Sequence, residues 1–174
     1  MKNQVHIPHI ASQLENTPPA LTTLLSGQPD TVYTAKIEEG KWSIQEVVWH
    51  LIHADRTNWP VRIQAILNTE NDAAFPAFDR AAPDPGCGSL AESLQLFATV
   101  RKEKLHYLRG LNLDEAQLDR SATHPELGAV TLGQLLATWA VHDFTHLAQV
   151  NRLLAKQYRN HVGPWESFLT ILNR

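Results

Sequence analysis

The chain has 174 residues, of which 43% are hydrophobic and 19% charged, and its formal net charge at pH 7 is −3. This composition indicates a globular protein with a substantial core and excludes a disordered chain. The weak negative charge, with no run of Lys and Arg, gives no reason to expect nucleic acid or an anionic membrane as a partner.

No stretch of the sequence approaches the roughly 18 apolar residues of a membrane span. The N-terminal segment has no continuous apolar run like that of a secretory signal. The single cysteine, Cys87, excludes an internal disulfide framework. We therefore expect one cytoplasmic domain over residues 1–174, with no membrane partner.

The first forty residues are weakly patterned. Thr17, followed by Pro18 and Pro19, is typical of an N-cap with prolines in the first helical turn. We expect a short helix from this point to Gly27, and then a connection over 32–40.

Three long helices are predicted next, each beginning at a capping box, in which Ser or Thr is followed three residues later by Glu or Gln. Pro60 lies inside the first of these helices, so a kink or a break is expected there. Gly110 is expected to end the second. The helices are predicted over 43–68, 89–109 and 132–157, with the boxes Ser43 and Glu46, Ser89 and Glu92, and Thr131 and Gln134.

A final short helix is predicted over 164–172, where Trp165, Phe168 and Leu169 would dock against the bundle. No segment shows the alternation of a strand. The predicted fold class is therefore all-α, a four-helix bundle with short terminal helices. The connections over 69–88 and 111–130 are long, so they allow a crossover connection and could form a rim over a site.

One face of the last long helix is apolar except at its middle. A buried polar side chain without a partner costs about 1–3 kcal/mol, so the two histidines and the glutamine there need partners. Two histidines four residues apart on one helix face suit a shared divalent metal ion. The residues of this face follow one another at spacings of three and four, and they are Leu132, Leu135, Trp139, His142, His146, Gln149 and Leu153.

A third ligand is expected from the helix over 43–68. His50 lies on the apolar face of that helix, whereas His53 is turned roughly 60° further away, so His50 is the first candidate and His53 the reserve. His50, His142 and His146 would provide three neutral nitrogen ligands and leave positions open, as in catalytic metal sites. The alternative is that they are core residues hydrogen-bonded to carbonyl or carboxylate groups.

Several other polar residues could assist this site. Asp143 gives the segment 142–146 a superficial likeness to the H-E-x-x-H pattern of zinc proteases. Aspartate is one methylene shorter than glutamate, however, so Asp143 is expected at the surface or behind a ligand. Asp55 and Glu46 could each accept a histidine N–H, and Gln149 could orient a ligand, bind substrate or be a core amide.

The remaining candidates have simpler interpretations. Cys87 has no identifiable activating base and is interpreted as an incidental thiol. Solvent exposure is expected for His6, His9, His106, His124 and His161. The five tryptophans are expected to pack in the core and between helices, and they are Trp42, Trp49, Trp59, Trp139 and Trp165.

The chain resembles the DinB/YfiT-like superfamily in GKWSIQEVVWHLIHAD at 40–55, HPELGAVTLGQLLATWAVHDFTHLAQV at 124–150 and VGPWESFLTIL at 162–172. The resemblance implies a four-helix bundle with a crossover connection, often dimeric, so a homodimer is expected. It also implies a divalent metal ion such as Zn²⁺ or Ni²⁺, held by one histidine of the second helix and the H-x-x-x-H pair of the last. In this sequence, these ligands are His50, His142 and His146.

Some members of that superfamily resemble metal-dependent S-transferases, which use bacillithiol, mycothiol or glutathione, and some resemble related isomerases. Other members have been described as metal-dependent hydrolases. The resemblance therefore implies first a detoxifying or stress-related transfer of a low-molecular-weight thiol to a small-molecule electrophile. Metal-dependent hydrolysis is the second hypothesis. The third is a stress-related binding bundle without enzymatic activity, in which the histidines are structural.

Overall fold

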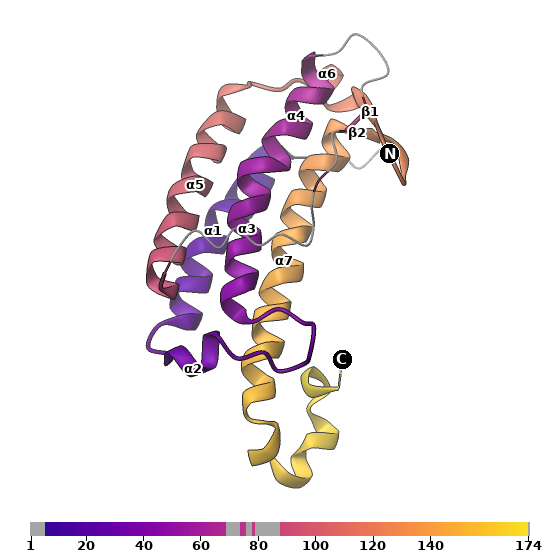
Figure 1. The fold of residues 1–174 in the computed structure, drawn as a ribbon. Helices are drawn as coiled ribbons and strands as arrows, with labels where there is room; N and C mark the ends of the chain where they lie inside the picture. The colour runs from indigo at the N-terminus through magenta and orange to yellow at the C-terminus, as the bar shows by residue number, and fades with distance from the viewer. Residues whose placement is uncertain (1–5, 69–73, 76–77, 79–87, 174) are drawn as a thin grey trace.

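The computed structural model describes residues 6–68, 74–75, 78 and 88–173 (Figure 1). Its long helices are α1 (Ile7–Leu25), α3 (Ile44–Thr57), α4 (Trp59–Asn68), α5 (Leu90–Gly110) and α7 (Leu132–Gln157). The short elements are α2 (Asp30–Tyr33), α6 (Glu115–Asp119), β1 (Ser121–His124), β2 (Gly128–Thr131), η1 (Arg159–His161), η2 (Gly163–Phe168) and η3 (Thr170–Leu172). None of the described helices is both long and apolar enough to cross a bilayer.

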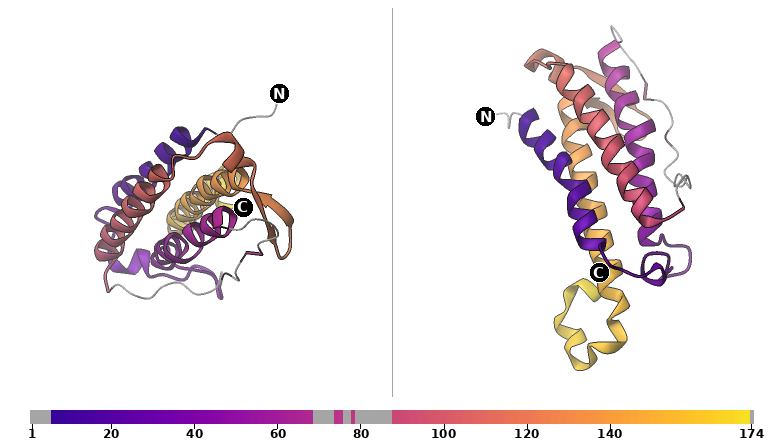
Figure 2. Two further views of the ribbon diagram at one scale, coloured as in Figure 1. Left: turned by 90° about the horizontal axis from the view of Figure 1, so that it is seen from above. Right: turned by 90° about the vertical axis from the view of Figure 1, so that its left-hand side faces the viewer.

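The long helices form a four-helix bundle with crossed connections. Both α1 and α3 pack on α5 and α7, so α1 and α3 occupy opposite corners of the bundle, as do α5 and α7 (Figures 1 and 2). Helix α4 extends beyond the end of α3 and also packs on α7. The pairs α1 and α3, and α5 and α7, therefore each lie on a diagonal, whereas α3 and α5 are neighbours. The predicted all-α bundle with a crossover connection is confirmed.

The three predicted capping boxes are present. Ser43, Ser89 and Thr131 each accept a hydrogen bond from the backbone N–H three residues later, and the Glu or Gln at that position accepts one in return. The last long helix has the predicted bounds, because its capping box and its apolar periodicity agree on them.

Helix α1 begins at Ile7, so the prediction of a start at Thr17 was wrong. The imidazole of His6 caps the helix by accepting a hydrogen bond of 3.3 Å from the backbone N–H of His9. A histidine is an uncommon cap, since Ser, Thr, Asp and Asn are the residues usually found there. The sequence signal at Thr17 was therefore stronger than the signal at the true start.

Pro18 lies inside α1, where it has a compensating partner from another helix. Proline has no N–H, so it leaves the carbonyl of the residue four positions earlier without its helical donor. That carbonyl belongs to Leu14, and it accepts a hydrogen bond of 2.8 Å from the guanidinium of Arg101 on α5. A side chain thus replaces the missing backbone donor, which allows the helix to continue through the proline.

The interruption expected near Pro60 is a break. Asn58 separates α3 from α4 with φ of −104° and ψ of −67°, and Pro60 lies in the first turn of α4. The break places Asn58 and Trp59 on the wall of the cavity described below.

A two-stranded antiparallel hairpin precedes α7, and the absence of strands predicted from periodicity was wrong. Its strands pair from Ser121 with Thr131 to His124 with Gly128. Strands of four residues are too short to show a clear alternation of polar and apolar side chains. Gly128 has φ of +73°, a left-handed conformation that glycine adopts without steric cost, and it allows the turn.

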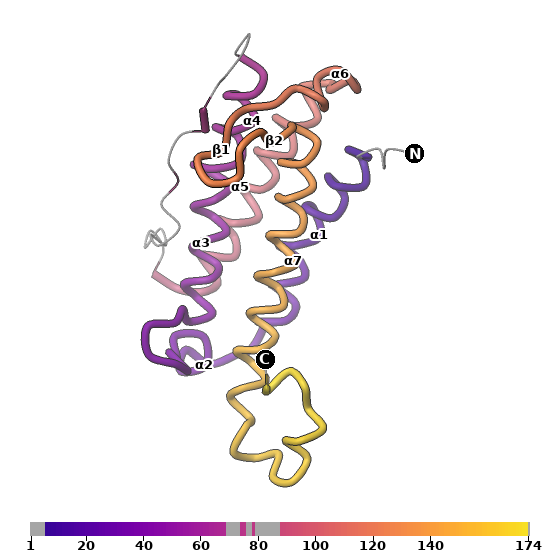
Figure 3. Tube along the Cα trace, turned by 90° about the vertical axis from the view of Figure 1, so that its right-hand side faces the viewer, coloured from indigo at the N-terminus to yellow at the C-terminus, as the bar shows by residue number. Residues whose placement is uncertain are grey.

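The C-terminal segment forms 3₁₀ turns that extend beyond the bundle (Figure 3), in place of the predicted helix over 164–172. Gly163 has a positive φ of 54°, and the next residue, Pro164, has no N–H to donate, so regular α-helical bonding is interrupted. Trp165 and Phe168 are 71% and 78% exposed, so the expected docking was wrong for these side chains. Leu172 is the buried residue of the segment, and η3 packs on α7.

Candidate metal centre

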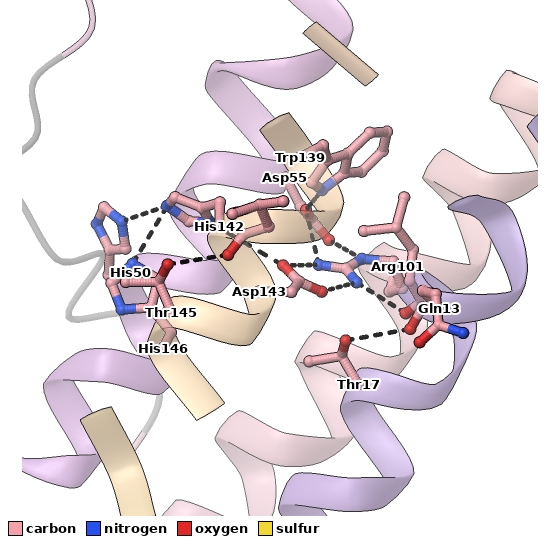
Figure 4. A network of polar contacts seen from close by, with 12 residues as sticks. Gln13, Thr17, His50, Asp55, Arg101, Trp139, His142, Asp143, Thr145 and His146 are labelled. Atoms are coloured by element: carbon pink, nitrogen blue, oxygen red, sulfur yellow. Dashed lines mark hydrogen bonds and ion pairs between the residues drawn. The ribbon is translucent and has the colours of Figure 1, made fainter. Parts of the chain in front are cut away.

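Three histidines from two helices direct their Nε2 atoms to one point (Figure 4). The Nε2 atom of His142 lies 3.1 Å from that of His50 and 3.2 Å from that of His146. His50 and His146 are only 4% and 9% exposed, and His142 is half-buried. Helices α3 and α7 thus bring together the three histidines chosen from the sequence.

Hydrogen bonds among neutral histidines do not explain both short contacts of the Nε2 atom of His142. A ring nitrogen carries either one proton or one lone pair, so Nε2 of His142 can serve only one of its two neighbours properly. Two nitrogen ligands at about 2.0–2.1 Å from a tetrahedral Zn²⁺ lie about 3.3 Å apart. Both observed separations are close to that value, so the three side chains fit a shared divalent ion.

The surroundings keep two of the rings neutral. Burial, followed by the nearby His146 and His142, lowers the pKa of His50 to about 3. Burial and the nearby His142 lower the pKa of His146 to about 4. The neutral imidazole is the form that binds a metal, so these lone pairs are available at pH 7.

Gln149 orients one of the three rings. Its Oε1 atom lies 2.8 Å from Nδ1 of His146, one helical turn earlier. A carbonyl oxygen can only accept, so Nδ1 carries the proton and Nε2 keeps its lone pair. Of the roles considered from the sequence, the structure places Gln149 behind a candidate ligand, a position typical of residues that fix ligand orientation.

A buried ionic network lies on the other side of His142 (Figure 4). The Arg101 guanidinium binds Asp55 through contacts of 2.6 and 3.1 Å, and Asp143 through contacts of 2.5 and 3.1 Å. Asp55 also accepts a hydrogen bond of 3.1 Å from the indole of Trp139. All three charged side chains are 2% exposed or less, so the network is part of the core.

The network contacts the histidine cluster through Asp143, whose Oδ1 atom lies 4.0 Å from Nδ1 of His142. Burial alone would raise the pKa of Asp143, but the Arg101 charge and the contacts with His142 and Arg101 outweigh burial and lower it. Asp143 is therefore buried behind the candidate ligand His142, which is one of the two positions expected for it.

Arg101 was missed by the sequence reasoning, although a signal was present. It is four residues from both Phe97 and Leu105, so it lies on the buried face of α5. A charged residue at such a position is almost never fully buried unless it is paired. This spacing could have predicted a buried ion pair.

Glu46, the third carboxylate considered from the sequence, is also engaged. It accepts a hydrogen bond of 2.7 Å from the N–H of Ser43 and forms an ion pair of 2.9 Å with Lys36. All three carboxylates considered near the site, Asp55, Asp143 and Glu46, therefore have other partners.

A cavity of about 420 Å³ opens beside the three histidines, lined mainly by aromatic and aliphatic side chains. Trp42 covers His50 and His146, with ring centroids 4.6 and 6.3 Å away. Trp59, which also lines the cavity, contacts His142 edge to face at 5.2 Å. None of the described lining residues is acidic.

Two further histidines occupy different positions from those of the cluster. The reserve candidate His53 lies outside it, where its ring stacks on Phe78 at 5.4 Å. His124 was expected to be exposed, and this was wrong, because it is 5% exposed and lines the cavity. The hairpin that buries it was not predicted. Cys87 lies outside the described residues.

The DinB superfamily profile matches residues 13–150. The chain belongs to the DinB superfamily. This match covers most of the bundle and all three histidines.

The curated relatives of this DinB superfamily chain carry names that refer to a metal. Two proteins of Oceanobacillus iheyensis, each named "Putative metal-dependent hydrolase", are similar to it. One is 26% identical over 146 residues, 83% of this chain and 79% of the relative, and the other is 27% identical over 145 residues, 82% of each. A Bacillus cereus protein with the same name is 22% identical over 143 residues, 81% of each chain.

A solved structure confirms the fold. It is that of YfiT from Bacillus subtilis, described as "a probable metal-dependent hydrolase with an unusual four-helix bundle topology". The TM-score is 0.74 at 22% sequence identity, over 90% of this chain and 89% of YfiT. The crossed bundle is therefore shared with a known structure.

Proposed function

We propose that this protein is a divalent-metal enzyme that acts on a small molecule, with His50, His142 and His146 as the metal ligands. The observation that carries the proposal is the convergence of three Nε2 atoms beside a cavity. The names of the curated relatives, which refer to metal dependence, support it. Zn²⁺ and Ni²⁺ both suit three imidazole ligands, and geometry and availability decide between such metals.

A bound divalent ion would supply Lewis acidity, which favours the deprotonated form of a thiol or water and polarises an electrophile. The chain supplies the rest of the site. Gln149 fixes the ring of His146, and Asp143 lies behind His142. Trp42 and Trp59 form aromatic walls of the cavity in contact with the cluster.

Between two reactions, we favour the transfer of a low-molecular-weight thiol to a small electrophile, a detoxifying or stress-related activity. In this reaction the thiol sulfur forms a bond to the electrophilic carbon, the bond from that carbon to a leaving group such as a halide breaks, and the leaving group departs with the electron pair. The thiol proton passes to solvent, so no protein base has to activate water. The engagement of Asp55, Asp143 and Glu46 in other contacts is consistent with this choice.

Metal-dependent hydrolysis is the second candidate, because the relatives are named after it. Of the three carboxylates considered, none is free to act as its general base. In a hydrolase with this site, the proton of the attacking water would pass directly to solvent or to a histidine of the cavity.

The two reactions are separated by the dependence on a thiol. The metal-loaded protein is assayed with a fluorogenic bimane and with activated esters, each with and without glutathione, bacillithiol or mycothiol. We expect bimane conjugation that needs both a thiol and the metal, and that is lost in His142→Ala. Ester hydrolysis that needs the metal but no thiol would establish the second candidate, and a protein that binds no metal would remove both.

A further inference from the structure

His124 is a buried polar side chain in the wall of the cavity, and the proposed metal site does not use it. It ends β1, pairs with Gly128 across the hairpin, and is 5% exposed. Phe75 contacts its ring edge to face at 6.0 Å. The hairpin thus carries an imidazole to the cavity that also contains the three clustered histidines.

The hydrogen bonding of His124 determines which ring nitrogen can bind a ligand. The backbone N–H of Glu126 donates to Nδ1 of His124 at 3.1 Å, within the turn. Since Nδ1 accepts, the ring proton is on Nε2, which is a donor. Among the described residues, no acceptor pairs with this Nε2–H. The ring lines the cavity, so this N–H is the group that His124 can offer to a ligand there.

Trp59 provides a second N–H without an acceptor in the same wall. Its ring stacks on Trp139, with centroids 5.8 Å apart. The Nε1–H of Trp139 donates to Asp55 at 3.1 Å, whereas Nε1 of Trp59, buried in a residue that is 3% exposed, has no partner in the described part of the chain. An indole nitrogen can only donate, so the missing partner is an acceptor.

The charges around these two donors favour an anionic acceptor. None of the described residues that line the cavity is acidic, and Arg62 lines it as well, with its guanidinium 5.0 Å above the ring of Phe75. Hydrogen bonds to a charged acceptor are about twice as strong as those between neutral groups. An organic carboxylate has the oxygen atoms and the charge that such a wall would bind.

We propose that His124 and Trp59 form a carboxylate-binding subsite, which holds an acidic group of the substrate beside the histidine cluster. This proposal rests on the proposed function in one respect: the ligand that occupies the cavity is taken to be the substrate. His124 and Trp59 are binding residues for a carboxylate-bearing small molecule, and the aromatic walls contact its apolar part. Neither side chain is a ligand of the metal.

Benzoate is the probe for this subsite, because it joins a carboxylate to a ring that the aromatic walls can contact, and benzamide is its neutral counterpart. Binding is measured by calorimetry on the full-length, metal-loaded protein and again after chelation. We expect the wild-type protein to bind benzoate more tightly than benzamide in both states. His124→Phe and Trp59→Phe should each weaken benzoate binding about tenfold, as expected for one hydrogen bond to a charged group.

Matched variants separate this loss from a general change in structure. His124→Gln keeps an N–H donor near the position of Nε2 and should retain most of the affinity for benzoate. Trp139→Phe alters the other tryptophan of the stacked pair and should leave benzoate binding unchanged. The melting temperature of each variant shows that it is folded.

Benzoate binding that equals benzamide binding, or that persists unchanged in both His124→Phe and Trp59→Phe, would overturn the subsite. Binding that disappears on chelation and ignores both substitutions would place the carboxylate on the metal, which overturns the subsite but supports the proposed metal site. Binding that depends on His124 in a protein that takes up no metal would retain the subsite and contradict the metalloenzyme.

Discussion

The two groups of buried polar side chains on either side of His142 differ in how completely they are paired. The Arg101 guanidinium is bound by Asp55, Asp143 and the carbonyl of Leu14, all from within the chain. In the histidine cavity, by contrast, several buried atoms have no hydrogen-bond partner in the described part of the structure, among them Nδ1 of His50, Nδ1 of His142, Oδ1 of Asn58 and Nε1 of Trp59.

This difference separates a structural network from a binding site. A buried polar group without a partner costs about 1–3 kcal/mol, and a protein retains several of them in one place only where something else completes them. The Arg101 network is complete as folded, so its changes should affect stability. In the proposed site a metal ion binds the Nε2 atoms of the histidines and a ligand pairs with Nε1 of Trp59, so changes in the histidine cavity should affect binding.

The largest expected effect comes from Arg101→Met, which leaves Asp55 and Asp143 buried without a counter-ion. Breaking a buried ion pair by removing one partner costs about 3–5 kcal/mol. Urea unfolding followed by tryptophan fluorescence measures the loss. The matched control is Arg109→Met, which removes a 2.7 Å ion pair with Glu15. The side chains of Arg109 and Glu15 are 51% and 58% exposed. Such pairs contribute about 1 kcal/mol or less, and equal losses in the two variants would contradict a structural role for the network.

Removal of the metal should have the next largest effect on stability. A ligand at 100 times its dissociation constant stabilises the folded state by about 2.7 kcal/mol, so a chelator should lower the unfolding free energy of the loaded wild-type protein by roughly that amount. The His146→Ala variant should not respond, because it lacks one ligand. A similar response of both proteins would show that the stabilising ion binds elsewhere.

The stacked tryptophans allow the same comparison on matched residues. Trp139→Phe removes a hydrogen bond to a buried carboxylate, and Trp59→Phe removes an N–H that has no hydrogen-bond partner among the described residues. Hydrogen bonds to charged groups contribute about 1.5–3 kcal/mol, so Trp139→Phe should destabilise the protein by roughly that much more. Thermal unfolding of the two metal-free variants measures this difference, and a larger loss for Trp59→Phe would reverse our interpretation of the pair.

The smallest effect is expected at Gln149. Residues that orient a metal ligand typically change affinity by 10–100-fold when replaced, and Gln149→Ala should weaken metal binding by about tenfold, the lower limit, because the ligand itself remains. Competition with a chromogenic chelator measures it. Gln149→Glu keeps an acceptor for Nδ1 of His146 and should retain the affinity, so a loss there as large as in Gln149→Ala would argue against the orienting role.

The helices and the positions of their histidines could be predicted where capping boxes and helical periodicity mark them in the sequence. Helix α7 has the predicted bounds because its capping box and its helical periodicity agree, and the same periodicity placed His142 and His146 on one face. His50 followed from its position on the apolar face of α3. These predictions needed only the helical repeat.

The features that depend on contacts between distant segments could not be predicted in this way. The carbonyl of Leu14 accepts from Arg101, 87 residues away, and this contact allows α1 to pass through Pro18. His124 is buried because a hairpin of two four-residue strands folds over the cavity. Neither arrangement leaves a periodic pattern in the sequence.

The most direct test of the account is elemental analysis of protein purified without a His-tag or chelator, beside His142→Ala and, as a control, His53→Ala. His53 is a histidine of the same helix as His50, but it lies outside the cluster. We predict about one divalent ion per chain in the wild type and in His53→Ala, and none in folded His142→Ala. No metal in the wild type after reloading, or equal metal in both variants, would contradict a metal centre at His50, His142 and His146.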